Sequence, residues 1–250
     1  LNKLIKDKYF LNEFLIKEID KTNNELKDEK YKRKTKILIE NFAHEDINFE
    51  EFETIEKLTV VINKEGLLKS YKDHLEIDKI NKTSKDLIDI FHIQSNQKLL
   101  IFVSSGRVFT VNPNDLPSGK ANPKSYIYFI EAETNDKLVS VLMPEENKNC
   151  LLVSSNGKGF ISDLYSLISN QKKGKKIFNL KISDYLINVS MCNHQYIAIT
   201  NTSGKLLIFD IKSLPILQKG SGVQLIKLKE NEKISDVKLI DKSESLSWKS

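Results

Sequence analysis

Four lysines surround one glycine in the stretch QKKGKK at residues 171–176. Lys172, Lys173, Lys175 and Lys176 would share one turn with Gly174, which has no side chain to block a close approach. Four ammonium groups on one turn can neutralise several phosphates of a nucleic acid strand. The stretch is therefore the first candidate binding site, and its chemistry is that of a polyanion receptor.

Positive charge is concentrated in the later part of the chain. Residues 1–150 hold 24 Lys and Arg against 26 Asp and Glu, whereas residues 151–250 hold 15 against 8. Such asymmetry is expected when one face meets a polyanion, although a basic stretch can also be merely solvated surface. Only Arg33 and Arg107 are arginines, and lysine suits phosphate better than it suits the edges of guanine. Contact with a nucleic acid backbone, with little sequence choice, is the better prediction.

Other kinds of site find little support in the sequence. Cys150 and Cys192 match no metal or redox spacing and are predicted to be small buried hydrophobic residues. The four histidines are scattered, without the paired spacing of a zinc site, and no G-x-x-x-x-G-K-[ST] sequence occurs. No run of 18 apolar residues is present, so no transmembrane helix is predicted. Metal, nucleotide and membrane are therefore not expected here.

The first fifty residues differ from the rest. Residues 1–40 contain no Gly or Pro, and apolar residues recur at helical spacing between charged ones, at Leu4, Leu11, Leu15, Ile19 and Leu26. This pattern predicts an amphipathic helix, which can break near Asn23 and Asn24, with a narrow seam that packs on another helix. Residues 41–56 are acidic and irregular, as in a linker. We therefore expect a helical or coiled-coil segment with a linker over residues 1–50, and a second domain over residues 51–250.

From residue 58 on, four stretches share one plan: an apolar run, a polar turn that ends in glycine, and a second apolar run. They cover residues 58–71, 99–111, 150–162 and 196–211, and their glycines are Gly66, Gly106, Gly157 and Gly204. Glycine supplies the positive φ of a tight hairpin. A repeat of about 45 residues predicts a mostly β fold of small sheets stacked as blades, each burying its apolar face against its neighbours. Tyr126, Tyr128 and Tyr196 also fit strand patterns.

In three repeats the second strand leads into a Leu-containing tail and then a turn with Gly and Lys. The tails cover residues 112–120, 163–171 and 210–218, and the turns are SGK (118–120), KKGKK (172–176) and KGSG (219–222). The turn with four lysines therefore has a counterpart in the repeat on either side.

This repeat resembles the C-terminal domain of the A subunit of bacterial topoisomerase IV, the paralogue of gyrase A. The most specific stretch is SSNGKGFISDLYSLISNQKKGKKIFNL (154–180), which matches the family's Gly-x-Gly-Phe motif, its connecting element and its N-x-x-x-G-K turn. The other repeats follow the family's successive blades in order, and ELKDEKYKRKT (25–35) resembles the helix that closes the family's catalytic core. The resemblance is colinear over essentially the whole chain, which is expected to be a piece of a longer protein because it begins at Leu1 without Met.

The resemblance implies a β-pinwheel, in which blades of four-stranded antiparallel sheet exchange strands with their neighbours. At least four blades are expected, with residues 231–250 starting or closing another before the chain stops. In the family, duplex DNA lies along the outer rim and is bent, so that DNA segments are presented for strand passage, decatenation and relaxation. The residues expected to contact it are Lys69, Arg107, Lys120, Lys124, Lys158, Lys172, Lys173, Lys175, Lys176, Lys205 and Lys219.

One motif separates the two paralogues. Gyrase A carries the basic box Q-R-R-G-G-K-G, which it needs to wrap DNA. The stretch at 171–176 keeps Gln171 and Gly174 but lacks the arginines and the second glycine, and the stretch QKGSG keeps Gln218, Gly220 and Gly222. Such degenerate boxes resemble topoisomerase IV, and a gyrase A wrapping domain is the alternative.

The resemblance also implies that this chain is a non-catalytic part of an ATP-dependent type II topoisomerase. The family's DNA-cleaving tyrosine follows an arginine, and no Arg-Tyr pair occurs here. No cofactor is expected in this chain, because Mg²⁺ and ATP would act elsewhere in the holoenzyme. The expected partners are duplex DNA, the ATPase B subunit of an A2B2 topoisomerase IV, and a second A subunit that would be bound mostly through other regions. The expected location is the cytoplasm, at the nucleoid.

Two other classes of function remain open. A propeller-like scaffold for protein partners would keep those partners at high salt, whereas DNA binding would be lost. A propeller enzyme acting on sugars or phosphoesters would need carboxylates or histidines that converge on a central channel. Residues 151–229 contain only three acidic residues, Asp163, Asp184 and Asp210, which argues against such an enzyme.

Overall fold

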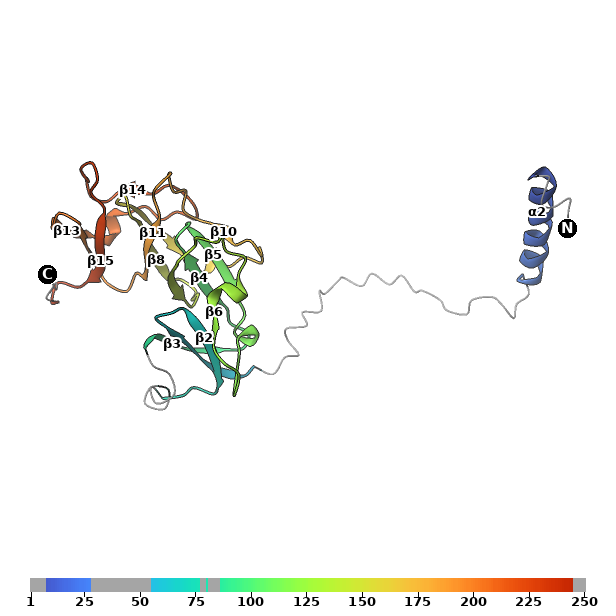
Figure 1. The fold of residues 1–250 in the computed structure, drawn as a ribbon, viewed down its shortest axis with the longest axis horizontal. Helices are drawn as coiled ribbons and strands as arrows, with labels where there is room; N and C mark the ends of the chain where they lie inside the picture. The colour runs from blue at the N-terminus through green and yellow to red at the C-terminus, as the bar shows by residue number, and fades with distance from the viewer. Residues whose placement is uncertain (1–7, 28–54, 77–79, 81–85, 245–250) are drawn as a thin grey trace. The chain divides into compact units, whose positions relative to one another are not determined.

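The computed structural model describes residues 8–27, 55–76, 80 and 86–244 (Figure 1). The chain divides into two compact units, Leu1–Glu51 and Phe52–Ser250. Leu4, most of the predicted linker and residues 28–40 of the predicted helical segment lie outside the described residues.

The first unit contains the helix α2 (Lys8–Glu25). The helix ends close to Asn23 and Asn24, where a break was predicted. The N–H of Leu26 donates to the carbonyl of Thr22 at 3.0 Å, and the N–H of Lys27 donates to the carbonyl of Asn24 at 3.3 Å. No side chain of the helix is buried, and Leu15 and Ile19 are 47% and 65% exposed. The predicted helix is confirmed over residues 8–25. No described helix is long and apolar enough to cross a membrane.

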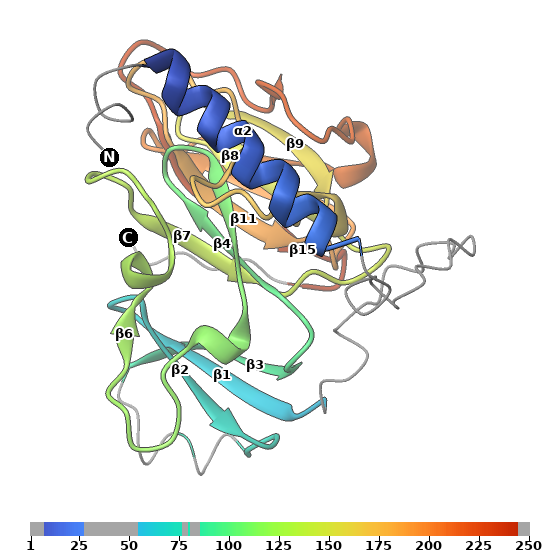
Figure 2. The same ribbon diagram turned by 90° about the vertical axis from the view of Figure 1, so that its right-hand side faces the viewer.

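The described residues of the second unit form four antiparallel sheets, which are the predicted blades (Figure 2). Blade 1 contains β1 (Lys57–Asn63), β2 (Leu67–Lys72), β3 (Leu87–Gln94) and β6 (Lys124–Ser125). Blade 2 contains β4 (Leu99–Val103), β5 (Arg107–Val111), β7 (Leu138–Leu142) and β10 (Lys175–Lys176). Blade 3 contains β8 (Asn149–Ser154), β9 (Lys158–Asp163), β11 (Leu186–Met191) and β14 (Val223–Gln224). Blade 4 contains, among the described residues, β12 (Tyr196–Asn201), β13 (Leu206–Asp210) and β15 (Ile234–Ile240).

Blades 1 to 3 each take their last strand from the chain that follows the next hairpin. The strand orders are β3-β1-β2-β6, β10-β5-β4-β7 and β11-β8-β9-β14. Strand β6 thus follows the β4–β5 hairpin of blade 2 but pairs with β2 of blade 1, and β10 and β14 repeat this pattern one and two blades later. Strand β15 pairs with β12, so residues 234–240 close the fourth blade. This is the strand exchange that the resemblance implied.

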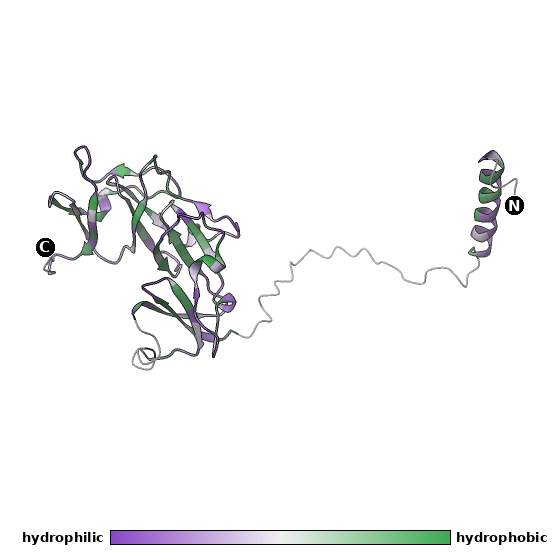
Figure 3. Ribbon diagram, in the orientation of Figure 1, coloured by the Kyte–Doolittle hydropathy of each residue, from purple (hydrophilic) through white to green (hydrophobic). Residues whose placement is uncertain are grey.

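The apolar core lies between successive blades (Figure 3). Strands present alternate residues on opposite faces, and the middle strands β4 and β8 are buried on both. Ile101 packs with Val60 in a cluster of blades 1 and 2, whereas its neighbour Phe102 packs with Leu152 in a cluster of blades 2 and 3. Leu151 belongs to the next cluster, with blade 4. The unbroken apolar runs in the sequence are therefore explained by a strand that has blades on both sides.

The four predicted hairpin glycines all have positive φ, between 73° and 80°, at Gly66, Gly106, Gly157 and Gly204. At the first three, the exchanged chain crosses over the glycine. The N–H groups of Tyr126, Ile177 and Leu225 donate to the glycine carbonyls at 2.9, 3.0 and 2.8 Å respectively. A Cβ on Gly106 would lie 2.8 Å from the carbonyl oxygen of Phe178, whereas a Cβ on Gly204 would meet nothing within 4 Å. The hairpin tips are therefore also docking points for the exchanged chain.

The strand prediction is wrong for Tyr126 and Tyr128, which lie in the 3-10 turn η4 (Tyr126–Phe129). The chain turns there because β6 ends at Ser125 and Tyr126 then packs over Gly66. Tyr128 is 77% exposed. Tyr196 lies in β12, as predicted.

The positions of two histidines and both cysteines follow from the strand pairing. His74 and His92 are far apart in the sequence, but their rings stack with centroids 4.9 Å apart because β3 pairs with β1 beside the end of β2. This contact was not predicted. Cys150 is buried, as predicted, but Cys192 is only half-buried. Burial raises the pKa of Cys192 to about 12, so its thiol is a poor nucleophile at neutral pH.

Blade 4 is expected to be the most acid-sensitive part of the second unit. Backbone N–H groups of Lys212, Lys229 and Gln195 lower the pKa values of the carboxyl groups of Asp210, Glu232 and Asp241 respectively. A carboxyl with a lowered folded-state pKa stabilises the fold above its unfolded pKa, near 4, and this stabilisation is lost as pH falls through the folded value. Below about pH 4, the protection of amide groups against hydrogen exchange should therefore fall in β12 and β15 more than in β4. An equal fall in protection in all blades would contradict this.

Candidate nucleic-acid interface

The 171–176 turn (Gln171–Lys176) runs from the chain after the 3-10 turn η5 (Tyr165–Leu167) into strand β10. The N–H of Gly174 donates to the carbonyl of Gln171 at 2.9 Å, and the φ of Gly174 is 68°. A Cβ on Gly174 would lie 2.7 Å from the ring of Phe109. Glycine is therefore required twice, for its backbone angle and for the contact of the turn with blade 2.

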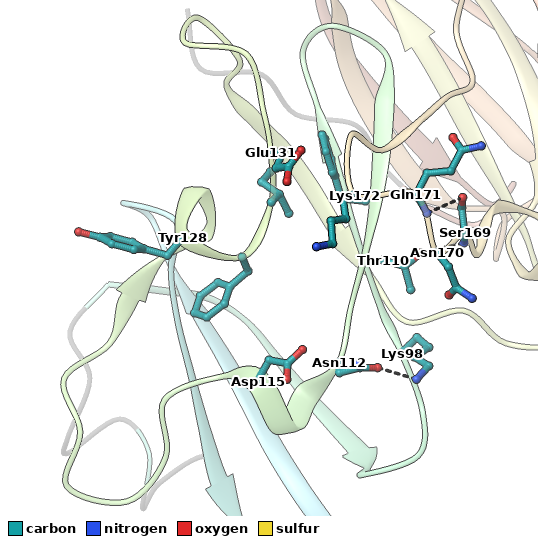
Figure 4. A pocket seen from close by; sticks show the side chains of 13 residues that line it. Lys98, Thr110, Asn112, Asp115, Tyr128, Glu131, Ser169, Asn170, Gln171 and Lys172 are labelled. Carbon is teal, nitrogen blue, oxygen red and sulfur yellow. Dashed lines mark hydrogen bonds between the residues drawn. The ribbon is translucent and has the colours of Figure 1, made fainter. Parts of the chain in front are cut away.

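The four lysines of this turn have different surroundings. Lys173 and Lys176 are exposed, and the structure gives their ammonium groups no hydrogen bond or ion pair with other described residues. Lys172 is also exposed, and its side chain reaches into a cavity of about 530 Å³ whose lining includes Tyr128 and Glu131 (Figure 4). Lys175 is half-buried, and its Nζ donates to the carbonyl oxygen of Ser166 at 2.7 Å. Three of the four ammonium groups are therefore open to a ligand.

Arg107, the first residue of β5, lies against the same turn. Its Nη1 donates to the carbonyl oxygen of Lys173 at 3.1 Å and to that of Gly174 at 3.3 Å. The sequence placed Arg107 at a hairpin tip and Lys173 in a separate basic turn. Strand exchange brings the two together, because Lys176 pairs directly with Arg107.

The 218–222 turn (Gln218–Gly222) lies beside the chain that leaves the 171–176 turn. The N–H of Asn179 donates to the carbonyl of Gly220 at 2.8 Å, and the N–H of Gly220 donates to that of Ile177 at 3.0 Å. Gly222 packs on the backbone of Gly159, where a Cβ would lie 2.7 Å from the carbonyl oxygen. The exposed Lys219 therefore lies in a turn that is hydrogen-bonded to the continuation of β10.

The basic turn of blade 1, residues 118–120, is held less closely. The N–H of Ser70 donates to the carbonyl of Pro117 at 3.0 Å, but a Cβ on Gly119 would meet nothing within 4 Å. Lys120 and Lys124 are exposed, and the Nζ of Lys124 lies 5.9 Å from the ring centroid of Tyr128. This turn therefore offers cations beside an exposed aromatic ring.

The remaining predicted cations lie at hairpin tips or along strands. Lys158 is half-buried and pairs with Gln224 of the exchanged strand β14. Lys205 is exposed at the tip of blade 4. The Nζ of Lys69, in β2, lies 5.2 Å from the ring centroid of Tyr71. None of these three makes an ion pair with the described residues.

Sequence reasoning missed a set of acidic residues that hold the hairpin tips. Asp136 accepts the N–H of Ser105 and Asp184 that of Asn156, both at 3.0 Å, and Glu232 accepts the side-chain amide of Asn201 at 3.1 Å. Each acid stands two residues before the third strand of its blade, so the repeat held a signal that could have found them. These carboxylates act within the blades. The described residues contain no group of three or more His, Cys, Asp and Glu that could hold a metal ion.

Comparisons with known proteins agree with this architecture. Residues 148–193 and 195–241 match the family described as the DNA gyrase C-terminal domain, a β-propeller. The C-terminal domain of Escherichia coli ParC superimposes with a TM-score of 0.66 at 20% identity, covering 74% of this chain and 80% of that one. A crystal structure of the C-terminal domain of DNA topoisomerase IV superimposes with a TM-score of 0.67 at 20% identity, covering 75% and 62% respectively. Residues 148–193 and 195–241 therefore match this family, and the second unit has the fold of these C-terminal domains.

Within this class, the relatives are A subunits of topoisomerase IV. The DNA topoisomerase 4 A subunit of Rickettsia felis is 31% identical over 86% of this chain, and that of Escherichia coli K12 is 24% identical over 71%. The chain spans only 29% of the length of the Rickettsia felis protein and 24% of the Escherichia coli one.

Proposed function

We propose that the second unit binds duplex DNA with little sequence choice, as the C-terminal DNA-binding part of a topoisomerase IV A subunit. One observation carries the proposal: backbone hydrogen bonds through residues 177–179 join the 171–176 and 218–222 turns. Lys173, Lys176 and Lys219 are therefore exposed on neighbouring turns of two blades, without ion pairs to described residues. A cationic surface that spans two blades suits a continuous phosphate backbone.

Bending of the duplex follows from cations on successive blades. A bend lets more phosphates reach lysines, and its elastic cost is on the order of 1–6 kcal/mol. In this proposal the bent duplex is presented to the catalytic part of the enzyme for strand passage, decatenation and relaxation. The scarcity of arginine, which limits bidentate contacts to guanine, supports binding without sequence choice.

The proposal assigns no catalytic residue and no cofactor to this chain. Mg²⁺ and ATP would be used elsewhere in an A2B2 holoenzyme, which would contain a second A subunit together with the ATPase B subunits. The location would be the cytoplasm, at the nucleoid. Mixing the chain with supercoiled plasmid and Mg²⁺ should produce no cleavage or relaxation. Cleavage that persists in a highly purified preparation would refute this part of the proposal.

Salt dependence tests the proposal directly. If about five phosphates are neutralised, a log–log plot of affinity against KCl concentration should have a slope between about −4 and −5. Fluorescence anisotropy with two duplexes of unrelated sequence should give similar slopes and similar affinities. A protein-interaction scaffold would show no DNA binding even in dilute buffer, and a large difference between the two duplexes would contradict sequence tolerance.

A topology assay separates the proposed function from gyrase-like wrapping. Nicked plasmid is ligated in the presence of the chain, and its linking number is then compared with that of plasmid ligated alone. The degenerate box favours little change. A strong shift in linking number would favour the gyrase-type alternative.

A further inference from the structure

Two cations of the interface are already bonded to carbonyl oxygens of the protein. Arg107 donates to Lys173 and Gly174 of the 171–176 turn, and Lys175 of the turn donates to Ser166 on the chain that enters it. Bonds from a charged donor are stronger than those between neutral groups. The turn is therefore held by two side chains that the sequence analysis had assigned to DNA.

Among the residues that the structure describes, no cation is bonded in this way to the 118–120 turn or to the 218–222 turn. In blade 1 the residue that follows the hairpin glycine is Leu67, which carries no charge. A Cβ added to Gly119 of the corresponding turn would have no atom within 4 Å. In blade 3 that residue is Lys158, and the tip is instead bonded by the side-chain amide of Gln224, which donates to the carbonyls of Asn156 at 3.0 Å and Gly157 at 3.3 Å. Among these three turns, the pair of hydrogen bonds from a guanidinium, here called the Arg107 clamp, is found at the turn with four lysines.

This turn is also the one that most needs a clamp. Four like charges within five residues repel one another, and a free turn would lose conformational entropy when it orders on a ligand. A turn that is already ordered avoids this cost and binds more tightly. Arg107 fixes the turn through its carbonyls, while the ring of Phe109 packs against Gly174.

We propose that Arg107 is a positioning residue, which holds the 171–176 turn so that Lys173 and Lys176 meet the duplex, and that it does not itself bind phosphate. This inference rests on the proposed function of DNA binding. It assigns different roles to cations that are alike in charge.

Substitution of Arg107 by Met separates positioning from direct contact. Loss of a phosphate contact makes the log–log salt slope shallower by about 0.9, whereas loss of positioning leaves the slope unchanged. We expect Arg107→Met to lower affinity about ten-fold, an effect of the order of one charge-assisted hydrogen bond, at an unchanged slope. The matched variant Lys176→Met should also lower affinity but with a slope shallower by about 0.9.

A lysine substitution at Arg107 and hydrogen exchange at Gly174 give two further tests. Arg107→Lys retains the charge but not the planar guanidinium, and we expect it to bind the duplex as weakly as Arg107→Met does. The proposal would be overturned if Arg107→Lys recovered full affinity and Arg107→Met had a shallower log–log salt slope. In the free protein, the amide of Gly174, which donates to Gln171, should exchange faster in both variants than in the unchanged chain. If the Gly174 amide exchanges at the same rate in both variants as in the protein without substitutions, Arg107 does not hold the turn, whether or not the protein binds DNA. If the protein without substitutions does not bind DNA, only the proposed function is refuted.

Discussion

Reversal of charge at Lys172, Lys173 and Lys176 is expected to lower duplex affinity by more than about 100-fold. Each phosphate contact that is lost removes about ten-fold in affinity near 0.1 M salt, and each glutamate adds repulsion. These three ammonium groups are exposed, whereas the ammonium group of Lys175 is bonded to Ser166 and is left unchanged so that the fold is retained. The measurement is anisotropy titration of the Lys→Glu triple variant with a labelled duplex.

A matched control distinguishes the position of the charges from their sum. Lys148, Lys238 and Lys242 are exposed and outside the basic turns, and their reversal to Glu changes the net charge by the same amount. This variant should lose much less affinity than the turn variant. Equal losses in the two variants would show that only net charge matters, and the placement of DNA on the turns would be wrong.

Gly106→Ala is expected to destabilise the second unit by roughly 3 kcal/mol or more. The positive φ of 75° alone costs about 1–2 kcal/mol for a residue with a Cβ. In addition, the new Cβ would lie 2.8 Å from the carbonyl oxygen of Phe178 and 2.9 Å from its Cβ, both in the exchanged chain, which must move away. Urea denaturation measures the loss, and hydrogen exchange at Ile177, which donates to the carbonyl of Gly106, reports whether the exchanged chain has left.

Gly204→Ala is the control for this substitution. Its φ of 80° imposes a similar backbone cost, but nothing lies within 4 Å of the new Cβ. It should therefore cost only about 1–2 kcal/mol, and the difference between the two variants measures the docking of the exchanged chain. Equal losses would mean that the exchanged chain contributes little to stability.

The hairpins and their order could be predicted from the sequence because the determinants are local. A glycine between two apolar runs fixes a tight turn within a few residues, and Gly66, Gly106, Gly157 and Gly204 all show the expected positive φ. The apolar runs likewise predicted strands that bury an apolar face against neighbouring blades, although burial of β4 and β8 on both faces was not predicted. The exchange of β6, β10 and β14 came from the family resemblance, since a two-residue strand carries almost no pattern of its own.

The roles of single cations could not be predicted, because charge alone does not say where a side chain points. Lys173 and Lys175 are two residues apart in the same turn, yet one is exposed and the other is bonded to Ser166. The bonds of Arg107 to residues 173 and 174 depend on a strand pairing between distant parts of the chain. His74 and His92 were missed as a pair for the same reason, since neither their spacing nor their neighbours indicate the contact.

Strand exchange also sets the order in which the blades can be finished during synthesis on the ribosome. The hairpin of blade 1 ends at Lys72, but its last strand ends at Ser125, after the whole hairpin of blade 2 has been made. The same delay applies to blade 2, whose last strand ends at Lys176. Successive blades must therefore mature in overlapping pairs. A nascent chain that stalls before residue 124 would expose the edge of β2, where association with other unfinished chains is most favoured.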